Sequence, residues 1–199
     1  VGNFFGCMPK EMQDNSHLYG VEIDSISGRI AQALYPNADI AISGFEKNSF
    51  QNGCFDVAVG NVPFGELGFK DEKHSTTKLH DYFFMEAMDK VKNGGIVAFV
   101  TSAGTLDKRD ESTRQMLADK ADLIGAIRLP GGKNGAFHDN AGTDVTTDII
   151  FLQKREGKSV AEMSDIPDWV HIGETADGLP INQYFADNPD MVLGKVVEG

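Results

Sequence analysis

The feature that most limits the fold of this chain is an alternation of short apolar runs with amphipathic helical segments. The expected strands cover residues 18–23, 38–42, 55–60, 96–100, 123–129 and 148–153, and the expected helices cover residues 25–34, 80–91 and 111–117. Strands that alternate with helices form βαβ units, so the pattern predicts an α/β fold with a mostly parallel sheet. No helix separates the last two strands, which predicts an antiparallel pair at the sheet edge.

A polar and aromatic tetrad, Asn61-Val62-Pro63-Phe64, directly follows the apolar run 55–60, which we interpret as a buried strand. Ligands of open α/β sheets bind at this carboxyl edge. The Asn61 side-chain oxygen and the Val62 carbonyl are acceptors suited to the two N–H bonds of a planar amine. Pro63 biases Val62 toward an extended conformation, and Phe64 offers a face for stacking. The alternative interpretation is a plain turn after a strand.

A second signal lies near the start of the chain, where Gly2 precedes Glu22 by 20 residues. In nucleotide-binding sheets, a glycine turn leads into a helix, and a carboxylate about 20 residues later binds the ribose hydroxyls. Glu22 ends an expected strand, as this role requires. Asp24 is better explained as the N-cap of the helix that begins at Ser25.

The tetrad resembles the Asn-Pro-Pro-Tyr/Phe motif of amino-group methyltransferases, chiefly the DNA methylases that modify adenine N6. Val62 stands where that family usually has proline, but a backbone carbonyl is present with either residue. The order of features along residues 1–155 is similar to that of type I restriction-system modification subunits and of helicase–methylase fusion polypeptides. Residues 127–130 and 147–155 resemble the closing strands of these subunits.

This resemblance implies a Rossmann-like sheet, S-adenosylmethionine as cofactor, and a catalytic role for Asn61, Val62, Pro63 and Phe64. The residues that it assigns to the cofactor are Gly2, Asn3, Phe4, Glu22, Ile23, Gly44, Phe45 and Glu46. Because the chain begins inside the family's cofactor motif, we expect a fragment of a longer protein whose sheet lacks its first strand. Residues 1–155 are then an N-terminally truncated catalytic domain, and residues 156–199 are a docked extension or a linker to a following module.

The implied reaction is methyl transfer to the exocyclic amine of adenine in DNA. A protein-glutamine or RNA methyltransferase is an alternative, because the same tetrad serves the same –NH2 geometry. A non-catalytic scaffold with a decayed site is another, and Val62 favours it.

The charge of the chain opposes autonomous DNA binding. The net charge of the 199 residues is −12, whereas affinity for nucleic acid rests largely on Lys and Arg contacts to phosphate. We therefore expect DNA to be held by other parts of the parent protein, with a helicase or specificity module as a possible partner. We also expect residues 1–199 alone to be inactive.

Several further features favour ordinary structural roles. No apolar run approaches the length of a membrane span, and the two cysteines fit a reducing cytoplasm. His74, His80 and Asp81 match no standard metal spacing, so we expect no metal and place these side chains in solvent. We expect a second set of charged residues to form a solvated, mixed-charge face: Lys108, Arg109, Arg114, Arg128 and Lys133.

Overall fold

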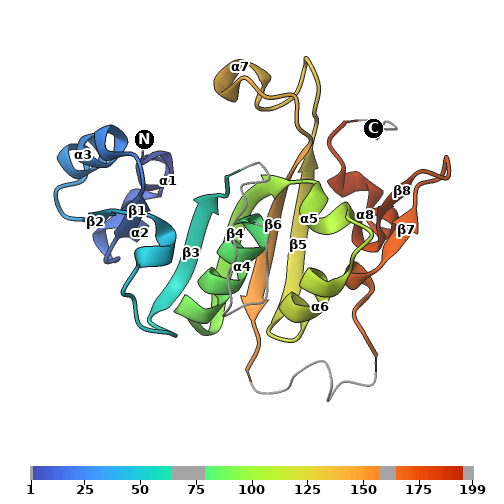
Figure 1. The fold of residues 1–199 in the computed structure, drawn as a ribbon, viewed down its shortest axis with the longest axis horizontal. Coiled ribbons are helices and arrows are strands. Elements are labelled where there is room, and N and C mark those ends of the chain that lie inside the picture. Colours follow the sequence, from blue (N-terminus) through green and yellow to red (C-terminus); the bar gives the residue numbers. More distant parts are fainter. Residues whose placement is uncertain (1, 64–78, 157–164, 195–199) are drawn as a thin grey trace. The chain divides into compact units, whose positions relative to one another are not determined.

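The computed structural model describes residues 2–63, 79–156 and 165–194, and it divides the chain into two compact units (Figure 1). Unit 1 comprises Val1–Gln51 and unit 2 comprises Asn52–Gly199. Unit 1 contains a two-stranded sheet, and unit 2 contains a four-stranded sheet and a second two-stranded sheet.

Unit 1 is built around two parallel strands and the helix that connects them. Its elements are α1 (Asn3–Gly6), α2 (Lys10–Asp14), β1 (Tyr19–Glu22), α3 (Ser25–Leu34), β2 (Asp39–Ile42) and the 3₁₀ turn η1 (Phe45–Lys47). Strand β1 pairs with β2 from Tyr19↔Asp39 to Glu22↔Ile42. The sequence predicted this β–α–β unit to within one residue at every boundary.

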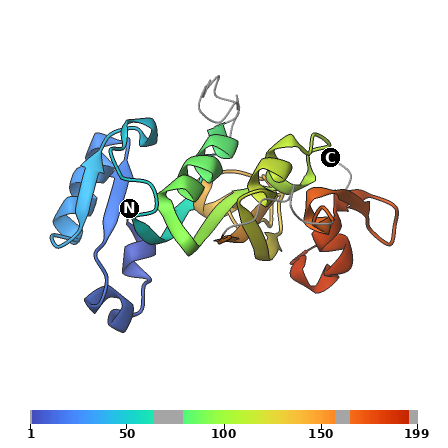
Figure 2. The same ribbon diagram turned by 90° about the horizontal axis from the view of Figure 1, so that it is seen from below.

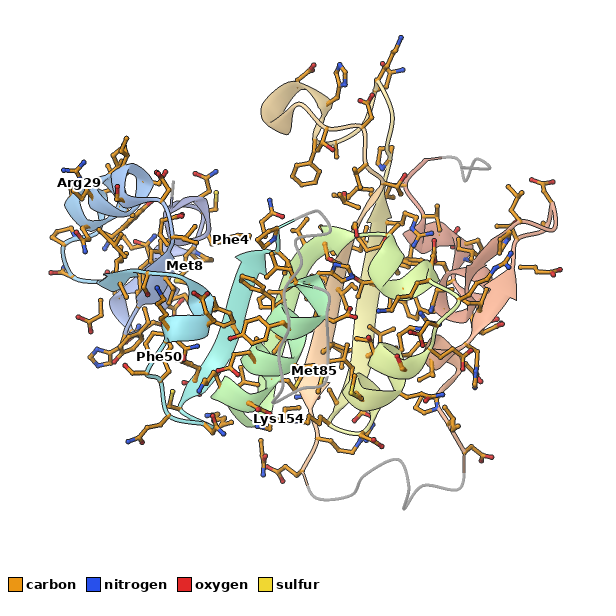
Figure 3. All side chains as sticks on the ribbon, viewed as in Figure 1. Phe4, Met8, Arg29, Phe50, Met85 and Lys154 are labelled. Carbon is orange, nitrogen blue, oxygen red and sulfur yellow. The ribbon has the colours of Figure 1, made fainter. Side chains whose placement is uncertain are left out.

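Helix α3 begins at a side-chain cap and packs through its smallest residues. The Asp24 carboxylate accepts a hydrogen bond from the Ser27 N–H at 2.7 Å, which confirms the predicted N-cap. Gly28 is buried, and a Cβ at this position would lie 2.7 Å from Ile42 Cγ1. Arg29 lies on the exposed side of the helix (Figure 3). The close approach of α3 to β2 therefore depends on glycine at position 28.

Unit 2 contains a four-stranded mixed sheet. Its elements up to residue 154 are β3 (Phe55–Asn61), α4 (Leu79–Lys90), β4 (Val91–Ser102), α5 (Gly104–Asp107), α6 (Ser112–Ala118), β5 (Ala121–Leu129), α7 (His138–Ala141) and β6 (Thr147–Lys154). The strand order is β3-β4-β6-β5, with β3 and β4 parallel and β6 antiparallel to both of its neighbours. The predicted antiparallel pair is confirmed, although β6 lies inside the sheet and β5 forms its edge.

The core of unit 2 lies between one face of this sheet and helices α4 and α6 (Figure 2). Phe84 and Met85 on α4 are buried there. The opposite face of β3 is more open, because Val57 and Val59 are each 47% exposed. The interpretation of residues 55–60 as a buried strand was therefore wrong at Val57 and Val59, which point away from α4.

The segment after residue 164 packs against α5, α6 and β5. Its elements are η3 (Asp168–Val170), β7 (Ile172–Glu174), β8 (Pro180–Asn182), α8 (Gln183–Asp187) and η4 (Pro189–Met191). Trp169, Ile181 and Phe185 are buried in the same core as Phe84. The compact units thus divide at residue 51, and residues 165–194 belong to unit 2. The catalytic boundary at residue 155 stays a prediction.

Candidate active site

The tetrad lies at the carboxyl end of β3, as the sequence predicted. Asn61 is the last residue of β3 and pairs with Val100 of β4. The Asn61 side chain is exposed, whereas Val62 is only 2% exposed and belongs to the core. Pro63 is exposed, and Phe64 lies outside the described residues. The alternation of an extended chain therefore turns Asn61 and Val62 to opposite sides of the backbone.

Backbone hydrogen bonding continues from β3 into the tetrad. The Val62 N–H donates to the Val100 carbonyl at 2.9 Å, which extends the β3–β4 ladder by one residue. No described N–H or O–H group donates to the Asn61 side-chain oxygen or to the Val62 carbonyl. Within the described part of the chain, both acceptors of the tetrad can therefore receive hydrogen bonds from a ligand.

In unit 1, strand pairing brings two groups of predicted cofactor residues together. Glu22 ends β1 opposite Ile42, the last residue of β2. The Ser43 N–H donates to the Glu22 carbonyl at 3.0 Å, so the turn that contains Gly44 begins beside Glu22. The carboxyl ends of parallel strands are where open α/β sheets bind ligands.

The side chains at this edge differ in exposure and bonding. One Glu22 oxygen, Oε1, accepts the Asp24 N–H at 2.9 Å. Ile23 is 76% exposed and presents an apolar surface. Gly44 is buried beneath the Glu46 carboxylate, and a Cβ at position 44 would lie 2.3 Å from Glu46 Oε1. Phe45 and Glu46 lie in the 3₁₀ turn that Gly44 precedes.

The third predicted group, Gly2, Asn3 and Phe4, forms the start of α1. Gly2 has a φ of 66° and precedes the helix, a conformation that favours glycine. A Cβ at Gly2 would lie 2.4 Å from Tyr35 Cε2. Phe5, in the same helix, meets the Tyr35 ring edge-on at 5.4 Å. The predicted glycine turn that leads into a helix is thus present. The Tyr35 ring lies against Gly2 and contacts Phe5.

The predicted cofactor residues therefore all lie in unit 1, and the described tetrad residues lie in unit 2. The structure joins Glu22 to the turn of Gly44, and it joins Asn61 to Val62. The roles of these residues in binding and catalysis stay predictions.

A buried ion-pair network in unit 2 was missed by the sequence analysis. Arg128 is 4% exposed and donates from Nε and Nη2 to the Asp148 carboxylate at 2.8 and 2.9 Å. Its Nη1 donates to Asp107 at 2.6 Å, and its guanidinium lies 4.4 Å from the centre of the Phe185 ring. Although burial alone would lower the pKa of Arg128, the two carboxylates raise it. The expectation of a solvated Arg128 was wrong.

Two further charged side chains are buried where solvent was expected. Arg114 is fully buried, and it donates to the Val170 and Lys108 carbonyls at 2.6 and 2.8 Å. Burial lowers the pKa of Arg114. Asp81 is 2% exposed and accepts hydrogen bonds from Lys108 at 2.6 Å and Thr113 at 2.7 Å. These groups fasten α4, α5, α6 and the C-terminal segment to one another.

Two features are absent from the residues that the structure describes. These residues contain no group of three or more His, Cys, Asp or Glu side chains placed to hold a metal ion. None of the helices formed by residues 2–63, 79–156 and 165–194 has the length and apolar character needed to cross a membrane.

The sequence of this chain matches a known protein family. The family described as Eco57I restriction-modification methylase matches residues 35–135, about half of the chain, including Asn61–Phe64. The chain belongs to this restriction-modification methylase family. A curated relative, Defense against restriction protein B of Escherichia phage P1, is 35% identical over 157 residues. That match covers 75% of this chain and 7% of the phage protein.

Solved structures confirm the methyltransferase fold. The chain resembles the EcoKI M protein of a type I restriction enzyme with a TM-score of 0.58 at 20% identity. This likeness covers 77% of the present chain and 35% of the M protein. A second solved chain, from a structure of a type I restriction-modification system, gives a TM-score of 0.55 at 21% identity, covering 70% of this chain and 31% of that one. The methylase chain described here therefore spans only a fraction of the length of the relatives that it matches.

Proposed function

We propose that this restriction-modification methylase transfers a methyl group from S-adenosylmethionine to the exocyclic amine of adenine in DNA. The observation that carries the proposal is the pair of acceptors at the carboxyl end of β3. Asn61 presents an exposed amide, and the neighbouring Val62 presents its backbone carbonyl while its side chain is anchored in the core.

In this reaction Asn61 and Val62 would position the amine, and neither would need to act as a strong base. The adenine amine is a poor nucleophile because its lone pair is delocalised into the ring. Asn61 Oδ1 and the Val62 carbonyl would each accept one of its N–H bonds, which favours a tetrahedral nitrogen and directs the lone pair toward the methyl donor. The base must first leave the duplex stack, because its amine is inaccessible there.

The cofactor supplies the electrophilic methyl group, and the residues of unit 1 are suited to hold it. Glu22 uses Oε1 for the Asp24 N–H, which leaves Oε2 as an acceptor for a ribose hydroxyl. Ile23 is exposed and offers an apolar surface to the adenine. We propose that the glycine turn of Gly2, Asn3 and Phe4 and the turn of Gly44, Phe45 and Glu46 complete this site.

The charge distribution favours a DNA-binding surface elsewhere in the full-length protein. The chain has a net charge of −12, and residues 165–194 contain six exposed acidic residues and no Lys or Arg. We propose that DNA is held by parts of the protein outside these 199 residues, including a helicase or specificity module. Residues 1–199 alone should then fail to methylate DNA.

The principal test is Asn61→Ala in the full-length protein. Removing the amide acceptor should reduce adenine methylation by about 100-fold or more, as for other positioning groups. Asn93→Ala is the matched control, because Asn93 is exposed on β4 of the same sheet, and this variant should retain the wild-type rate. A wild-type rate in Asn61→Ala would remove the proposal.

A protein-glutamine or RNA substrate is the second candidate. The net charge of −12 favours the protein substrate, because RNA is a polyanion like DNA. Labelled methyl groups should appear in the DNA fraction when the purified protein is offered DNA, RNA and protein together. Label in adenine of DNA would support the first proposal, and label in another fraction would replace it. Failure to turn over S-adenosylmethionine with any substrate would favour a scaffold with a decayed site.

A further inference from the structure

We infer that Val62 is a positioning residue, whose buried side chain and backbone N–H together hold the Asn61 and Val62 acceptors in place. The inference rests on the proposed function, because it concerns the same two acceptors. It assigns a role to the valine that stands where related methyltransferases usually have proline. The proposed role is specific to this chain, because proline has no N–H and cannot donate the corresponding hydrogen bond.

The first observation is that Val62 is anchored on its side-chain side. It is 2% exposed, and it is the residue of the described tetrad that belongs to the core of unit 2. The neighbouring positions, Asn61 and Pro63, are both exposed. Among residues 61–63, the buried Val62 side chain is therefore the point of attachment to the core.

The second observation is that Val62 is anchored on its backbone side. Its N–H donates to the Val100 carbonyl at 2.9 Å, one residue beyond the last β3–β4 pair. Pro63 restricts the preceding residue to extended conformations, which is the backbone shape that this hydrogen bond requires. The two anchors leave the Val62 carbonyl with little rotational freedom, and they fix the backbone from which the Asn61 side chain projects.

The rate of methyl transfer is expected to be sensitive to small displacements of the two acceptors. A displacement of about 1 Å can lower the rate of a reaction by about 100-fold. In this chain, the packing of valine and its hydrogen bond would supply the rigidity that a proline ring supplies elsewhere. Val62 is thus expected to act on the turnover rate through geometry, and to leave cofactor affinity unchanged.

The experiment compares Val62→Ala with Val91→Ala in the full-length protein. Val91 is a fully buried valine at the start of β4, so its variant removes the same atoms at the opposite end of the same sheet. Hydrogen exchange should show the amide of residue 62 opening at least tenfold faster in Val62→Ala than in Val91→Ala. The kcat of Val62→Ala should be ten- to hundredfold lower than that of Val91→Ala, with an unchanged KM for S-adenosylmethionine. Val62→Ile should have the kcat of the wild-type protein.

Equal exchange at residue 62 in the two alanine variants would overturn the inference, as would equal kcat values measured below both melting temperatures. The exchange measurement does not depend on catalysis. If the wild-type protein transfers no methyl group, the proposed function fails, whereas the exchange rates still decide whether Val62 anchors the turn.

Discussion

The two units of this chain differ in how they bury apolar side chains. Unit 2 has a continuous core in which Phe84, Met88 and Ile150 are at most 1% exposed. Among the described residues of unit 1, the buried hydrophobic residue is Ala31, and Ile30 on the same helix is 45% exposed. The contrast indicates that unit 2 can anchor Asn61 and Val62 to a core of its own, whereas the predicted cofactor residues lie on a thin layer of two strands and short helices.

The physical reason lies in the size and composition of the layers. A two-stranded sheet is marginally stable in water unless it packs against something larger. Helix α3 meets β2 through Gly28 and Ala31, which are too small to bury much apolar area. Unit 2 instead places aromatic and methionine side chains of α4 against strands β3 and β4. We therefore expect most of the stability to come from unit 2, whereas the predicted cofactor residues lie in the less stable unit 1.

Separating the units should give the largest effect. Residues 52–199 expressed alone should unfold cooperatively, with a melting temperature within a few degrees of that of the intact chain. Residues 1–51 alone should show no cooperative transition by circular dichroism, because so small a segment buries too little surface to offset its conformational entropy. A sharp melting transition in the isolated segment 1–51 would contradict the comparison.

Breaking an ion pair should have a large effect in unit 2 and almost none in unit 1. Arg128→Met leaves the buried Asp148 without its partner and should cost about 3–5 kcal/mol of unfolding free energy in urea titration. Lys10→Met breaks the exposed Lys10–Asp14 pair of α2 and should cost less than about 1 kcal/mol. The double variant Arg128→Met/Asp148→Leu should recover most of the loss. Equal costs for the two single variants would refute the contrast.

Acid should lower the stability of helix α3 in unit 1 by protonating its Asp24 cap. We expect this effect to be smaller than those of the two preceding predictions. Hydrogen bonds from Ser27 hold the pKa of Asp24 below its ordinary value of 3.8. A lowered folded-state pKa means that the cap stabilises the helix fully above pH 3.8 and is lost as the pH falls through the lower value. The protection of the α3 amides, measured relative to their intrinsic exchange rates at each pH, should therefore fall in this acid range. Asp24→Asn, which caps without a charge, should lack that step.

The parts of the fold that local signals specify were predicted well. Asp24 before Ser25, and Pro36 after Leu34, mark both ends of α3. The start of β4 was missed because Gly94, with a φ of 75°, interrupts the apolar run, and the strand in fact begins at Val91. In the sequence, Gly94 predicts the end of a helix. In the structure, it is an irregularity within strand β4.

The buried charges could not be predicted, because their burial depends on partners distant in sequence. Arg128 and Asp148 are 20 residues apart, and Arg114 bonds to Val170, which is 56 residues away. No local pattern distinguishes these arginines from Arg109, which is exposed. At the candidate site the sequence predicted a strand over residues 55–60, and β3 ends one residue later, at Asn61. The anchoring of Val62 could not be predicted, because it depends on the position of β4.

The place of β6 has a consequence for how the chain folds during synthesis. This strand is the last of the sheet to be synthesised, yet it lies between β4 and β5. Since ribosomes add about 5–20 residues per second, β4 waits for a few seconds with an open edge before its neighbour exists. During this time the exposed edge can pair with another nascent chain or recruit a chaperone. A nonsense mutation between Ser102 and Thr147 would therefore remove the middle of the sheet, and the shortened product should aggregate rather than accumulate as a smaller folded domain.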